Sequence, residues 1–325
     1  MTGPAVTSVI AAYRAGDFLR QAIASALAQT LTDLEVLVSD DADDPEVRRL
    51  TESFLDPRIR YRSNPTRLGP AGNHWAALLA ARGRYVAILN HDDLWRPEYL
   101  ASAVPVLDHT PDAVLVFCDH DVIDPSGRPL PAEADRTAKQ WGRDRLTPGL
   151  YRPFPDLVAR QAIPVAMGCL FRREGIDPTG LPDVGPAYDL WLAFALCRTG
   201  GGAYYLTDRL TAWRVHPGQL TATRNEGWTR GALACWQAMA DDPAFRPVRR
   251  TVQGRLSQTA SALGATQLAA GDHDAARSVA RLALRSRPAN WRAWAVLGLS
   301  LLPRGVAKRV TSRRGHHVAG SEAVR

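Results

Sequence analysis

Two clusters of carboxylates in this chain have the residue types and spacing that a ligand site needs. One is the run Asp-Asp-Ala-Asp-Asp at positions 40–44, and the other is the pair Asp92 and Asp93. Carboxylate oxygens accept hydrogen bonds from hydroxyl and N–H groups. They also bind divalent cations, which can bridge to phosphate oxygens. Both clusters therefore suit a phosphorylated ligand held with a cation, and the alternative for each is a solvated loop that caps the next helix.

The segments around these clusters predict strands that alternate with helices. Apolar runs predict strands over 6–12, 34–38, 59–62, 85–89 and 114–118. Apolar residues at helical spacing predict helices over 46–54, over 71–81 and from Asp17, which we expect to act as a cap. Such alternation is typical of right-handed βαβ units and a mostly parallel sheet flanked by helices. The fold class is therefore α/β and resembles a Rossmann fold.

Polar residues follow three of these predicted strands. Tyr13 follows the first strand, Asp40 and Asp41 end the second, and the segment Asn90–Asp93 follows the strand that ends at Leu89. Ligands of open parallel sheets bind beyond the carboxyl ends of the strands. The three polar ends therefore predict one site at one edge of the sheet.

The rest of the chain predicts a change of architecture near residue 225. The stretch 124–155 is rich in Pro, Gly and charge, which predicts a loop or mobile flap; we further expect strands over 165–172 and 203–206 and a helix over 188–198. Beyond 225 only helices are predicted, over 228–239, 252–269 and 274–284, the last two joined by a turn at Gly271-Asp272. One such hairpin is too little for a tetratricopeptide array. The chain thus divides into an α/β domain over 1–225 and a helical extension over 226–325 with a basic, flexible tail.

Composition and charge exclude some classes of protein. The chain has 325 residues, 46% of them hydrophobic, and a formal net charge of +7. A basic chain suits nucleic acid, an anionic membrane or phosphorylated small molecules, but no nucleic-acid-binding module is recognised. Neither a G-x-G-x-x-G after the first strand nor a phosphate-binding G-x-x-x-x-G-K motif is present, which argues against a dinucleotide-dependent oxidoreductase and a P-loop enzyme.

Cysteine usage and the terminal segments bear on location. The four cysteines form no C-x-x-C pair, so we expect isolated buried thiols in a reducing compartment. Neither a secretory signal nor an apolar run of about 18 residues is seen, which predicts a cytoplasmic protein. Residues 291–302 are apolar with two tryptophans and have basic flanks, which predicts peripheral contact with the inner face of an anionic membrane. The alternative is a helix packed on the domain, followed by a disordered basic tail.

Five segments, in order, resemble family 2 glycosyltransferases, which have the GT-A fold. They are VTSVIAAY at 6–13, DLEVLVSDD at 33–41, the stretch 64–93 with its Asn, Gly and Asp-Asp positions, YDLWL at 188–192 and WRVHPG at 213–218. The resemblance covers roughly residues 5–225. It implies an inverting enzyme that moves a sugar from a nucleoside diphosphate sugar to the hydroxyl of a sugar, lipid-linked or small-molecule acceptor. Synthesis of a polysaccharide, glycolipid or other glycoconjugate is the implied setting.

The resemblance also implies roles for residues at matching positions. The donor-binding residues would be Tyr13 and Asp41 at the nucleobase, Asp92 at the ribose, Arg214 at the diphosphate, and Arg67. Asp93 would bind Mg²⁺ or Mn²⁺, with His216 as a further metal or phosphate ligand. Asp189 would be the general base that deprotonates the acceptor.

Two departures from the family pattern bear on these roles. Asn90 replaces the first Asp of an Asp-x-Asp signature, which puts metal dependence in question because an amide is a poorer metal ligand. Pro186 and Ala187 stand where relatives carry an acidic pair, so the base is Asp189 or Asp183. These departures leave open a catalytically silent nucleotide-sugar-binding or scaffold protein with the same fold. A nucleic-acid-binding protein is a third reading, prompted by charge alone.

Overall fold

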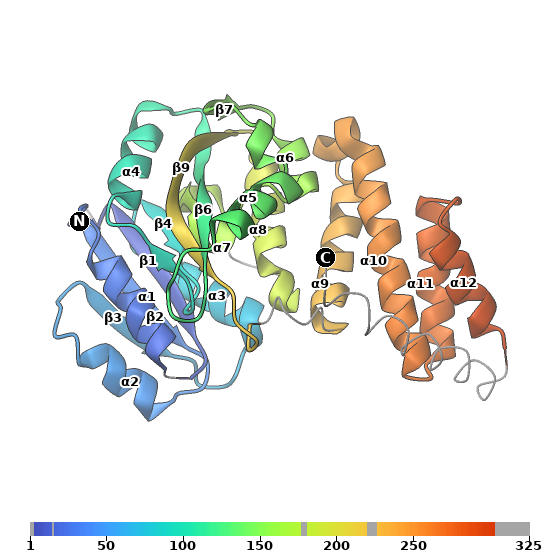
Figure 1. Ribbon diagram of the computed structural model, residues 1–325, viewed down its shortest axis with the longest axis horizontal. Coiled ribbons are helices and arrows are strands. Elements are labelled where there is room, and N and C mark those ends of the chain that lie inside the picture. The colour runs from blue at the N-terminus through green and yellow to red at the C-terminus, as the bar shows by residue number, and fades with distance from the viewer. Residues whose placement is uncertain (1–2, 15, 177–180, 220–225, 303–325) are drawn as a thin grey trace. The chain divides into compact units, whose positions relative to one another are not determined.

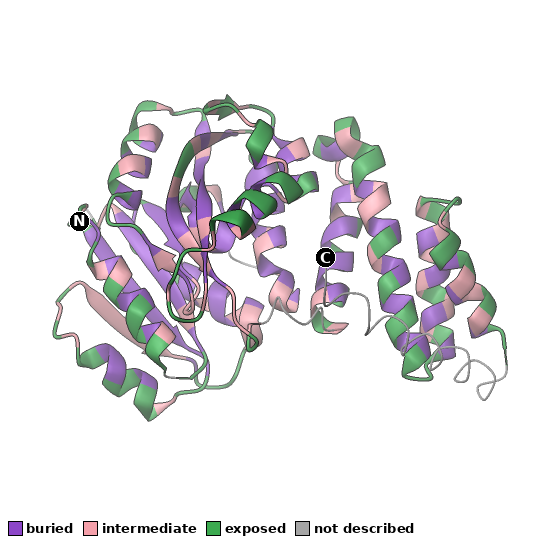
Figure 2. Ribbon diagram, in the orientation of Figure 1, coloured by how far each residue is buried: buried purple, intermediate pink, exposed green. Residues whose placement is uncertain are grey.

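The apolar runs in the first ninety residues form four parallel strands, as predicted. They are β1 (Val6–Ala12), β2 (Leu34–Asp40), β3 (Ile59–Ser63) and β4 (Tyr85–Ile88). β1 lies between β2 and β4, and β3 pairs with the outer side of β2. Figure 2 shows β1, β2 and β4 largely buried, as expected for a parallel sheet covered on both faces, and the edge strand β3 only partly buried. This computed structural model describes residues 3–14, 16–176, 181–219 and 226–302.

Beyond β4 the sheet becomes mixed. Its order is β3-β2-β1-β4-β8-β6-β9-β5, with β7 paired to β9 (Figure 1). β8 (Cys169–Arg172) runs antiparallel between β4 and β6 (Ala113–Ile123), whereas β6 and β9 (Gly202–Arg214) are parallel. The short strands β5 (Leu94–Trp95) and β7 (Gly149–Tyr151) are antiparallel to β9. Among the described strands, parallel and antiparallel pairings are therefore equal in number.

Helices cover both faces of the parallel part. The helices α1 (Asp17–Leu27), α2 (Pro45–Glu52) and α4 (Tyr99–His109) share one apolar cluster with β1, β2 and β4. α3 (Gly69–Ala80) packs on β1 and β2 from the other side (Figure 1). The expectation that Asp17 caps α1 is wrong. Gly16 occupies the N-cap, where it has no side chain to accept a hydrogen bond. Asp17 lies in the first turn, where its negative charge interacts favourably with the positive end of the helix dipole.

The expected loop at 124–155 is also wrong. It contains α5 (Pro131–Gln140), η1 (Arg143–Arg145) and β7, and it runs into α6 (Pro155–Arg160). The prolines misled the prediction because Pro131 and Pro155 each open a helix, where a missing N–H costs nothing. Arg143, almost fully buried, anchors the segment by donating from Nε to Asp119 Oδ1 at 2.9 Å.

The expected strand over 165–172 begins instead as the short helix α7 (Val165–Gly168), and only its second half is β8. Two 3₁₀ turns, η2 (Arg173–Gly175) and η3 (Gly185–Ala187), and the helix α8 (Tyr188–Arg198) follow in this part of the chain. α8 has the predicted bounds. β9 is far longer than the expected strand over 203–206, because its polar second half pairs with β6 and β5.

The chain divides into two compact units, Met1–Thr223 and Arg224–Arg325. The described part of the second unit is helical, with α9 (Glu226–Asp241), η4 (Pro243–Val248), α10 (Arg249–Ala269), α11 (His273–Ser286) and α12 (Trp291–Ser300). The predicted turn at Gly271 has φ +82°, and Asp272 caps α11 by accepting from the Ala275 N–H at 3.0 Å. α12 packs against α10 and α11. The predicted basic tail lies outside the described residues.

Two further expectations can be compared with the structure. All four cysteines are free and buried, as predicted for isolated thiols. Within the described ranges, every helix is too short or too polar to span a bilayer.

Candidate functional site

The carboxyl ends of β1 and β2 hold Asp41 in a buried position. Its N–H donates to the Ala12 carbonyl at 2.9 Å, which joins the two strand ends. Its carboxylate accepts from Asn64 Nδ2 at 2.9 Å and from the Leu68 and Gly69 N–H groups at 2.8 Å each. Asp41 therefore fixes the loop that leads into α3. Most of its acceptor capacity is already used within the protein.

The loop that Asp41 fixes carries Arg67 to Tyr13. Tyr13, just after β1, is 37% exposed, and the Arg67 guanidinium lies 4.2 Å from its ring centroid. An exposed tyrosine ring with a stacked guanidinium offers planar surfaces and positive charge at one point. Tyr13, Arg67 and Asp41 thus come together at the predicted edge of the sheet.

Asp93 lies beneath this edge. It is 1% exposed, and its two oxygens accept from the Arg214 N–H at 2.9 Å and from Asn90 Nδ2 at 3.0 Å. Burial, followed by the charge of Asp92, raises the pKa of Asp93 well above its usual range. The structure therefore uses both Asp93 oxygens to join the loop after β4 to the end of β9.

Asp92 points toward His216 instead. Asp92 Oδ2 lies 3.1 Å from His216 Nε2, and both side chains are about 15% exposed. The Gly218 N–H donates to His216 Nδ1 at 3.2 Å, which assigns the proton of a neutral ring to Nε2 and makes it the donor to Asp92. The partly exposed oxygen–nitrogen pair is thus Asp92 with His216, and Asp93 is not part of it.

Arg214 is fully buried between these loops. Its Nε donates to the Asp92 carbonyl at 2.9 Å and its Nη2 to Gln21 Oε1 at 2.8 Å, and the guanidinium lies 4.6 Å from the Phe18 ring centroid. Nη1 donates to the carbonyls of Asp124 and Pro125. The guanidinium therefore ties the Asp92 loop to α1 and to the turn after β6.

A hydrogen-bond chain joins Asp93 to the start of α8. The Tyr188 hydroxyl donates to Asn90 Oδ1 at 2.8 Å, and Asn90 Nδ2 donates onward to Asp93. The Tyr188 ring stacks on His74, with centroids 3.7 Å apart. Burial, with the charges of Asp189, Asp92 and Asp93, raises the pKa of Tyr188 well above its usual range. An amide suits position 90 because one end must donate to a carboxylate while the other accepts from a hydroxyl.

The next residue after Tyr188 is the predicted base, Asp189. Its Oδ1 accepts from the Leu190 N–H at 2.7 Å, and burial raises its pKa to about 6. The positive end of the helix dipole favours the ionised form, but burial outweighs it. The alternative base, Asp183, is exposed and accepts from the Gly185 N–H at 3.0 Å.

The sequence did not predict the roles of Tyr188, which bonds to Asn90, and of His74, which stacks on the Tyr188 ring. Tyr188 entered only as the first residue of the YDLWL motif, and nothing in the sequence singled out His74. The signal for Tyr188 was a hydroxyl directly before a candidate base at a helix start. The stacking of His74 on it has no signal in a single sequence, because 114 residues separate the two rings.

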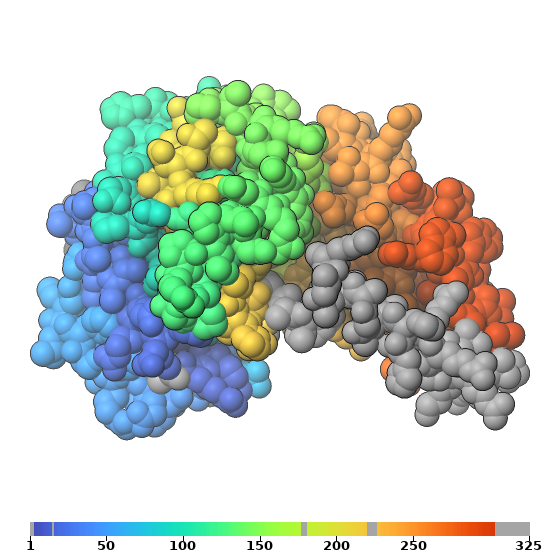
Figure 3. Space-filling model, in the orientation of Figure 1, coloured from blue at the N-terminus to red at the C-terminus, as the bar shows by residue number. Residues whose placement is uncertain are grey.

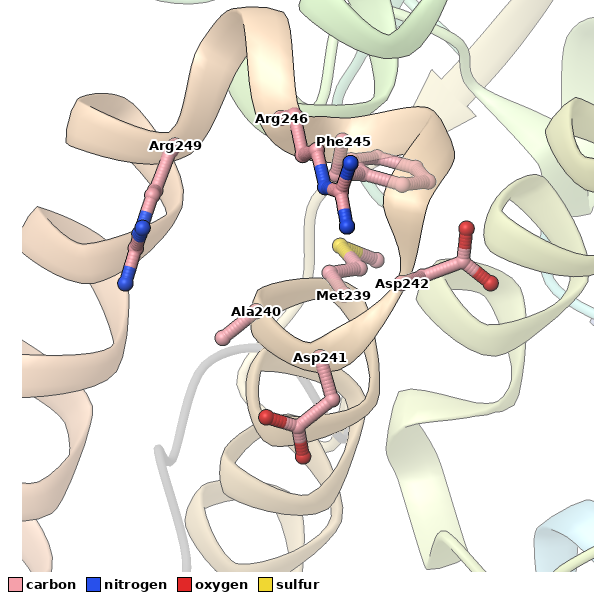
Figure 4. A pocket seen from close by; sticks show the side chains of 7 residues that line it. All are labelled: Met239, Ala240, Asp241, Asp242, Phe245, Arg246 and Arg249. Carbon is pink, nitrogen blue, oxygen red and sulfur yellow. The ribbon is translucent and has the colours of Figure 1, made fainter.

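Two hollows lie elsewhere and contain none of the predicted site residues. One, of about 250 Å³, lies at the turn between α9, η4 and α10 and is lined by Met239, Asp241, Asp242, Phe245, Arg246 and Arg249, among others (Figure 4). The other, of about 450 Å³, is lined by Tyr85 among others. Tyr85 is the first residue of β4, so this hollow lies at the opposite end of that strand from Asn90. We base the candidate site on the converging polar groups rather than on either hollow.

The donor set can be tested for its fit to a metal. Among the described residues, no group of three or more His, Cys, Asp or Glu side chains is arranged to hold an ion. The Asp92 carboxylate offers an oxygen that suits Mn²⁺ or Mg²⁺ when ligand phosphates complete the coordination, and His216 Nε2 becomes a second ligand once it gives up the proton that it donates to Asp92. The residues present thus fit a metal that is shared with a diphosphate.

Curated relatives match parts of this chain in sequence. Succinoglycan biosynthesis protein ExoO of Rhizobium meliloti is 38% identical over 127 residues, which is 39% of this chain and 36% of ExoO. An uncharacterized protein, y4gI, of Sinorhizobium fredii is 31% identical over 227 residues, which is 68% of this chain but only 23% of that protein. The chain therefore matches about a third or less of these two relatives.

Solved structures share the fold. Residues 1–349 of S. aureus TarS, in complex with UDP-GlcNAc, superpose with a TM-score of 0.61 at 12% identity, covering 95% of this chain and 92% of that fragment. Mannosyltransferase PcManGT from Pyrobaculum calidifontis, in complex with GDP-Man and Mn²⁺, superposes with a TM-score of 0.55 at 22% identity, covering 94% and 87%. Residues 7–171, half of the chain, match the family described as Glycosyl transferase family 2. The chain belongs to this family and has its GT-A fold.

Proposed function

We propose that the chain transfers a sugar from a nucleoside diphosphate sugar to an acceptor hydroxyl, with inversion at the anomeric carbon, in polysaccharide or related glycoconjugate synthesis. The observation that carries the proposal is the chain of bonds from Asp93 through Asn90 to Tyr188, which ties the start of α8, where Asp189 follows Tyr188, to the loop that holds Asp92 and Asp93. A carboxyl group with a pKa of about 6 is well matched to accept a proton near neutral pH. Kinship with ExoO, named for succinoglycan biosynthesis, supports the setting.

The donor end of the site follows from the same geometry. The Tyr13 ring and the Arg67 guanidinium offer a stacking surface for a nucleobase. Asp92 and His216 would hold the divalent cation, which neutralises charge on the departing diphosphate when bound. Asp93 and Arg214 would not contact the donor. Both are buried, and they would act by holding the Asp92 loop in place. Asp41 would act mainly by fixing the Arg67 loop.

At the acceptor end, Asp189 takes the proton of the acceptor hydroxyl. The oxygen attacks the anomeric carbon, the bond from that carbon to the phosphate oxygen breaks, and the nucleoside diphosphate leaves with the electron pair. A single displacement of this kind inverts configuration. A double displacement would need a second carboxylate placed as a nucleophile at the same carbon.

A panel of nucleotide sugars tests the proposal. We expect one or a few UDP-, GDP- or dTDP-sugars to raise the melting temperature when Mn²⁺ is present, because ligand binding stabilises the folded state by mass action. The same sugars should be hydrolysed slowly or transferred to an added acceptor, and proton NMR should show inversion. Binding without any turnover would identify a silent binding protein, and retained configuration would exclude the single displacement.

Removing the stacked pair tests the base-binding surface. We expect Tyr13→Ala and Arg67→Ala each to weaken nucleoside diphosphate affinity about 5–150-fold, since stacking on one base contributes about 1–3 kcal/mol. Calorimetry with UDP and GDP measures the effect. Arg14→Ala is the matched control, because the Arg14 guanidinium also approaches the Tyr13 ring but lies farther from it, at 5.2 Å. Equal losses in Arg67→Ala and Arg14→Ala, with no loss in Tyr13→Ala, would mean that general charge, not the stacked pair, attracts the ligand.

The hydroxyl of Tyr188 tests the bond chain between the two ends. Tyr188→Phe keeps the ring stacked on His74 and removes the bond to Asn90. We expect kcat to fall about tenfold, with donor affinity changed less than twofold, because misplacing a catalytic group slows the reaction without altering donor contacts. Steady-state kinetics with direct donor binding separates the two effects. A loss confined to KM would show that Tyr188 serves donor binding instead.

A further inference from the structure

α12 leaves one apolar side uncovered. Ala293, Val296 and Ser300 are buried against its helical neighbours. On the other side, large apolar residues recur at the spacing of one helical stripe, with exposed fractions of 65% for Trp291, 56% for Trp294, 65% for Leu301 and 40% for Leu302. A helix that is apolar on both sides, with only one side covered, calls for a second partner. We call these four residues the α12 stripe; α11 and α12 form the red surface in Figure 3.

The sequence around the α12 stripe is rich in basic residues, with Asp274 of α11 near its C-terminal end, where it pairs with Arg277, which also donates to the Ser300 carbonyl. Residues 275–321 include no Asp or Glu, and their ten basic residues are Arg277, Arg281, Arg285, Arg287, Arg292, Arg304, Lys308, Arg309, Arg313 and Arg314. The Arg292 guanidinium lies 5.5 Å from the Trp291 ring centroid. Trp294 Nε1 donates to the Pro288 carbonyl at 2.9 Å, which holds its ring at the turn next to the exposed Arg287. Aromatic rings and cations therefore occur together at the start of α12.

Charge and composition decide among the partners that could cover the stripe. A second copy of the chain would bring two predominantly basic surfaces together, which is repulsive in a self-complementary contact. The chain's own residues 303–325 include no Leu, Ile, Met or aromatic side chain, so they are a poor apolar match. A nucleic acid would use the cations and the tryptophans but not Leu301 and Leu302. An anionic bilayer uses all three features, since Trp and Leu enter the boundary region while cations meet the headgroups.

We propose that α12 is a docking surface for an anionic membrane. The helix lies in the plane of the interface, with Trp291, Trp294, Leu301 and Leu302 inserted at the boundary between headgroups and acyl chains. The arginines of α11 and of the turn before α12 face the phosphates. This inference concerns the second unit alone and holds whichever sugar the first unit transfers.

Co-sedimentation of the full chain with vesicles tests the proposal. We expect binding to phosphatidylglycerol-containing vesicles, weakening as salt is raised, and little binding to pure phosphatidylcholine. The double variant Trp291→Ser/Leu301→Ser should bind about tenfold more weakly, because it removes inserted apolar area. The matched control is Leu55→Ser/Leu79→Ser, which removes two exposed leucines (91% and 58%) from the first unit and should bind like the wild type. Arg281→Gln/Arg285→Gln should lower affinity only for the anionic vesicles.

Each other outcome counts against the proposal. Equal partitioning of the wild type and the α12 variant, or equal loss in the Leu55/Leu79 control, would overturn it. A wild-type dimer that the α12 variant dissociates, without vesicle binding, would assign the stripe to a second copy, and tight RNA binding without vesicle binding would assign it to nucleic acid. Should the variant fail to fold by circular dichroism, quenching of wild-type tryptophan fluorescence by brominated anionic lipid is the deciding measurement, and its absence contradicts insertion.

Discussion

Asp189→Asn is expected to lower turnover by roughly 10²–10⁴-fold while donor affinity stays within about twofold of the wild type. The amide keeps the size of the side chain and can still accept from the Leu190 N–H, so α8 should begin as before. What is lost is the group that removes the acceptor proton. Rapid-quench or steady-state transfer assays measure the rate, and calorimetry with the nucleoside diphosphate measures donor affinity.

The pH dependence of the reaction gives an independent test of the same residue. Burial raises the pKa of Asp189 to about 6, and a general base works only when it is deprotonated. The wild-type kcat/KM should therefore fall tenfold per pH unit below about 6 and level off above it. In Asp189→Asn the remaining activity should lack this acid limb. An acid limb that stays at the same pH in the variant would belong to another group.

The same substitution should make the folded protein more stable at neutral pH. The pKa of Asp189 is about 6 when folded and near the ordinary 3.8 when unfolded, so the folded state binds the proton more tightly and ionisation destabilises it. This destabilisation of the folded state reaches its full size above about pH 6 and disappears below about pH 4. Asparagine carries no such cost, so the free energy of unfolding should rise by about 1–3 kcal/mol at pH 8, with no difference at low pH. Urea titrations at several pH values measure this.

Asp183→Asn is the matched control for all three measurements. Asp183 is exposed, and it accepts a local hydrogen bond from the Gly185 N–H. Activity, pH profile and stability should therefore stay close to those of the wild type. If Asp183→Asn loses turnover while Asp189→Asn keeps it, the base is Asp183. If neither substitution matters, the proposed catalytic step is wrong.

The strand ends could be predicted from the sequence because their signals are local. An apolar run that stops at Tyr13, at Asp41 or at Asn90 marks both the strand and its polar end, and parallel order places the ends together. The direction of each side chain at those ends is not local. Asp41 and Asp92 look alike in the sequence. Asp41 accepts from N–H groups at the start of α3, whereas Asp92 contacts His216, which lies 124 residues further along the chain.

The errors in the second half of the sheet have the same origin. Proline density in 124–155 predicted a loop, but the segment is also held by contacts between residues distant in the sequence, such as Arg143 with Asp119, and Pro131 and Pro155 open helices rather than interrupt them. The helices after residue 225 were predicted well, because apolar spacing and the Gly271 turn are again local features. Long-range pairing, as between Asn90 and Tyr188, has no counterpart in one sequence.

The Asp92 and Asp93 side chains are expected to separate metal binding from folding. Asp92→Ala should lower Mn²⁺-dependent affinity for a nucleoside diphosphate by at least about 10–100-fold, the loss seen when even outer-shell contacts of a metal site are removed. Its melting temperature should change little, since the carboxylate is partly exposed and its backbone carbonyl still accepts from Arg214. Calorimetry with and without Mn²⁺ gives the affinities.

Asp93→Ala should act on the fold instead. It leaves the buried Arg214 N–H and the Asn90 amide without their acceptor, and each unsatisfied buried donor costs about 1–3 kcal/mol. The melting temperature should therefore fall by several degrees, while the folded fraction should still respond to Mn²⁺. The family resemblance predicts the reverse, with Asp93 as the metal ligand. If Asp93→Ala melts like the wild type and loses the Mn²⁺ response, while Asp92→Ala keeps it, the ion belongs to Asp93, and the Asp92–His216 contact is an ordinary hydrogen bond at the rim of the site.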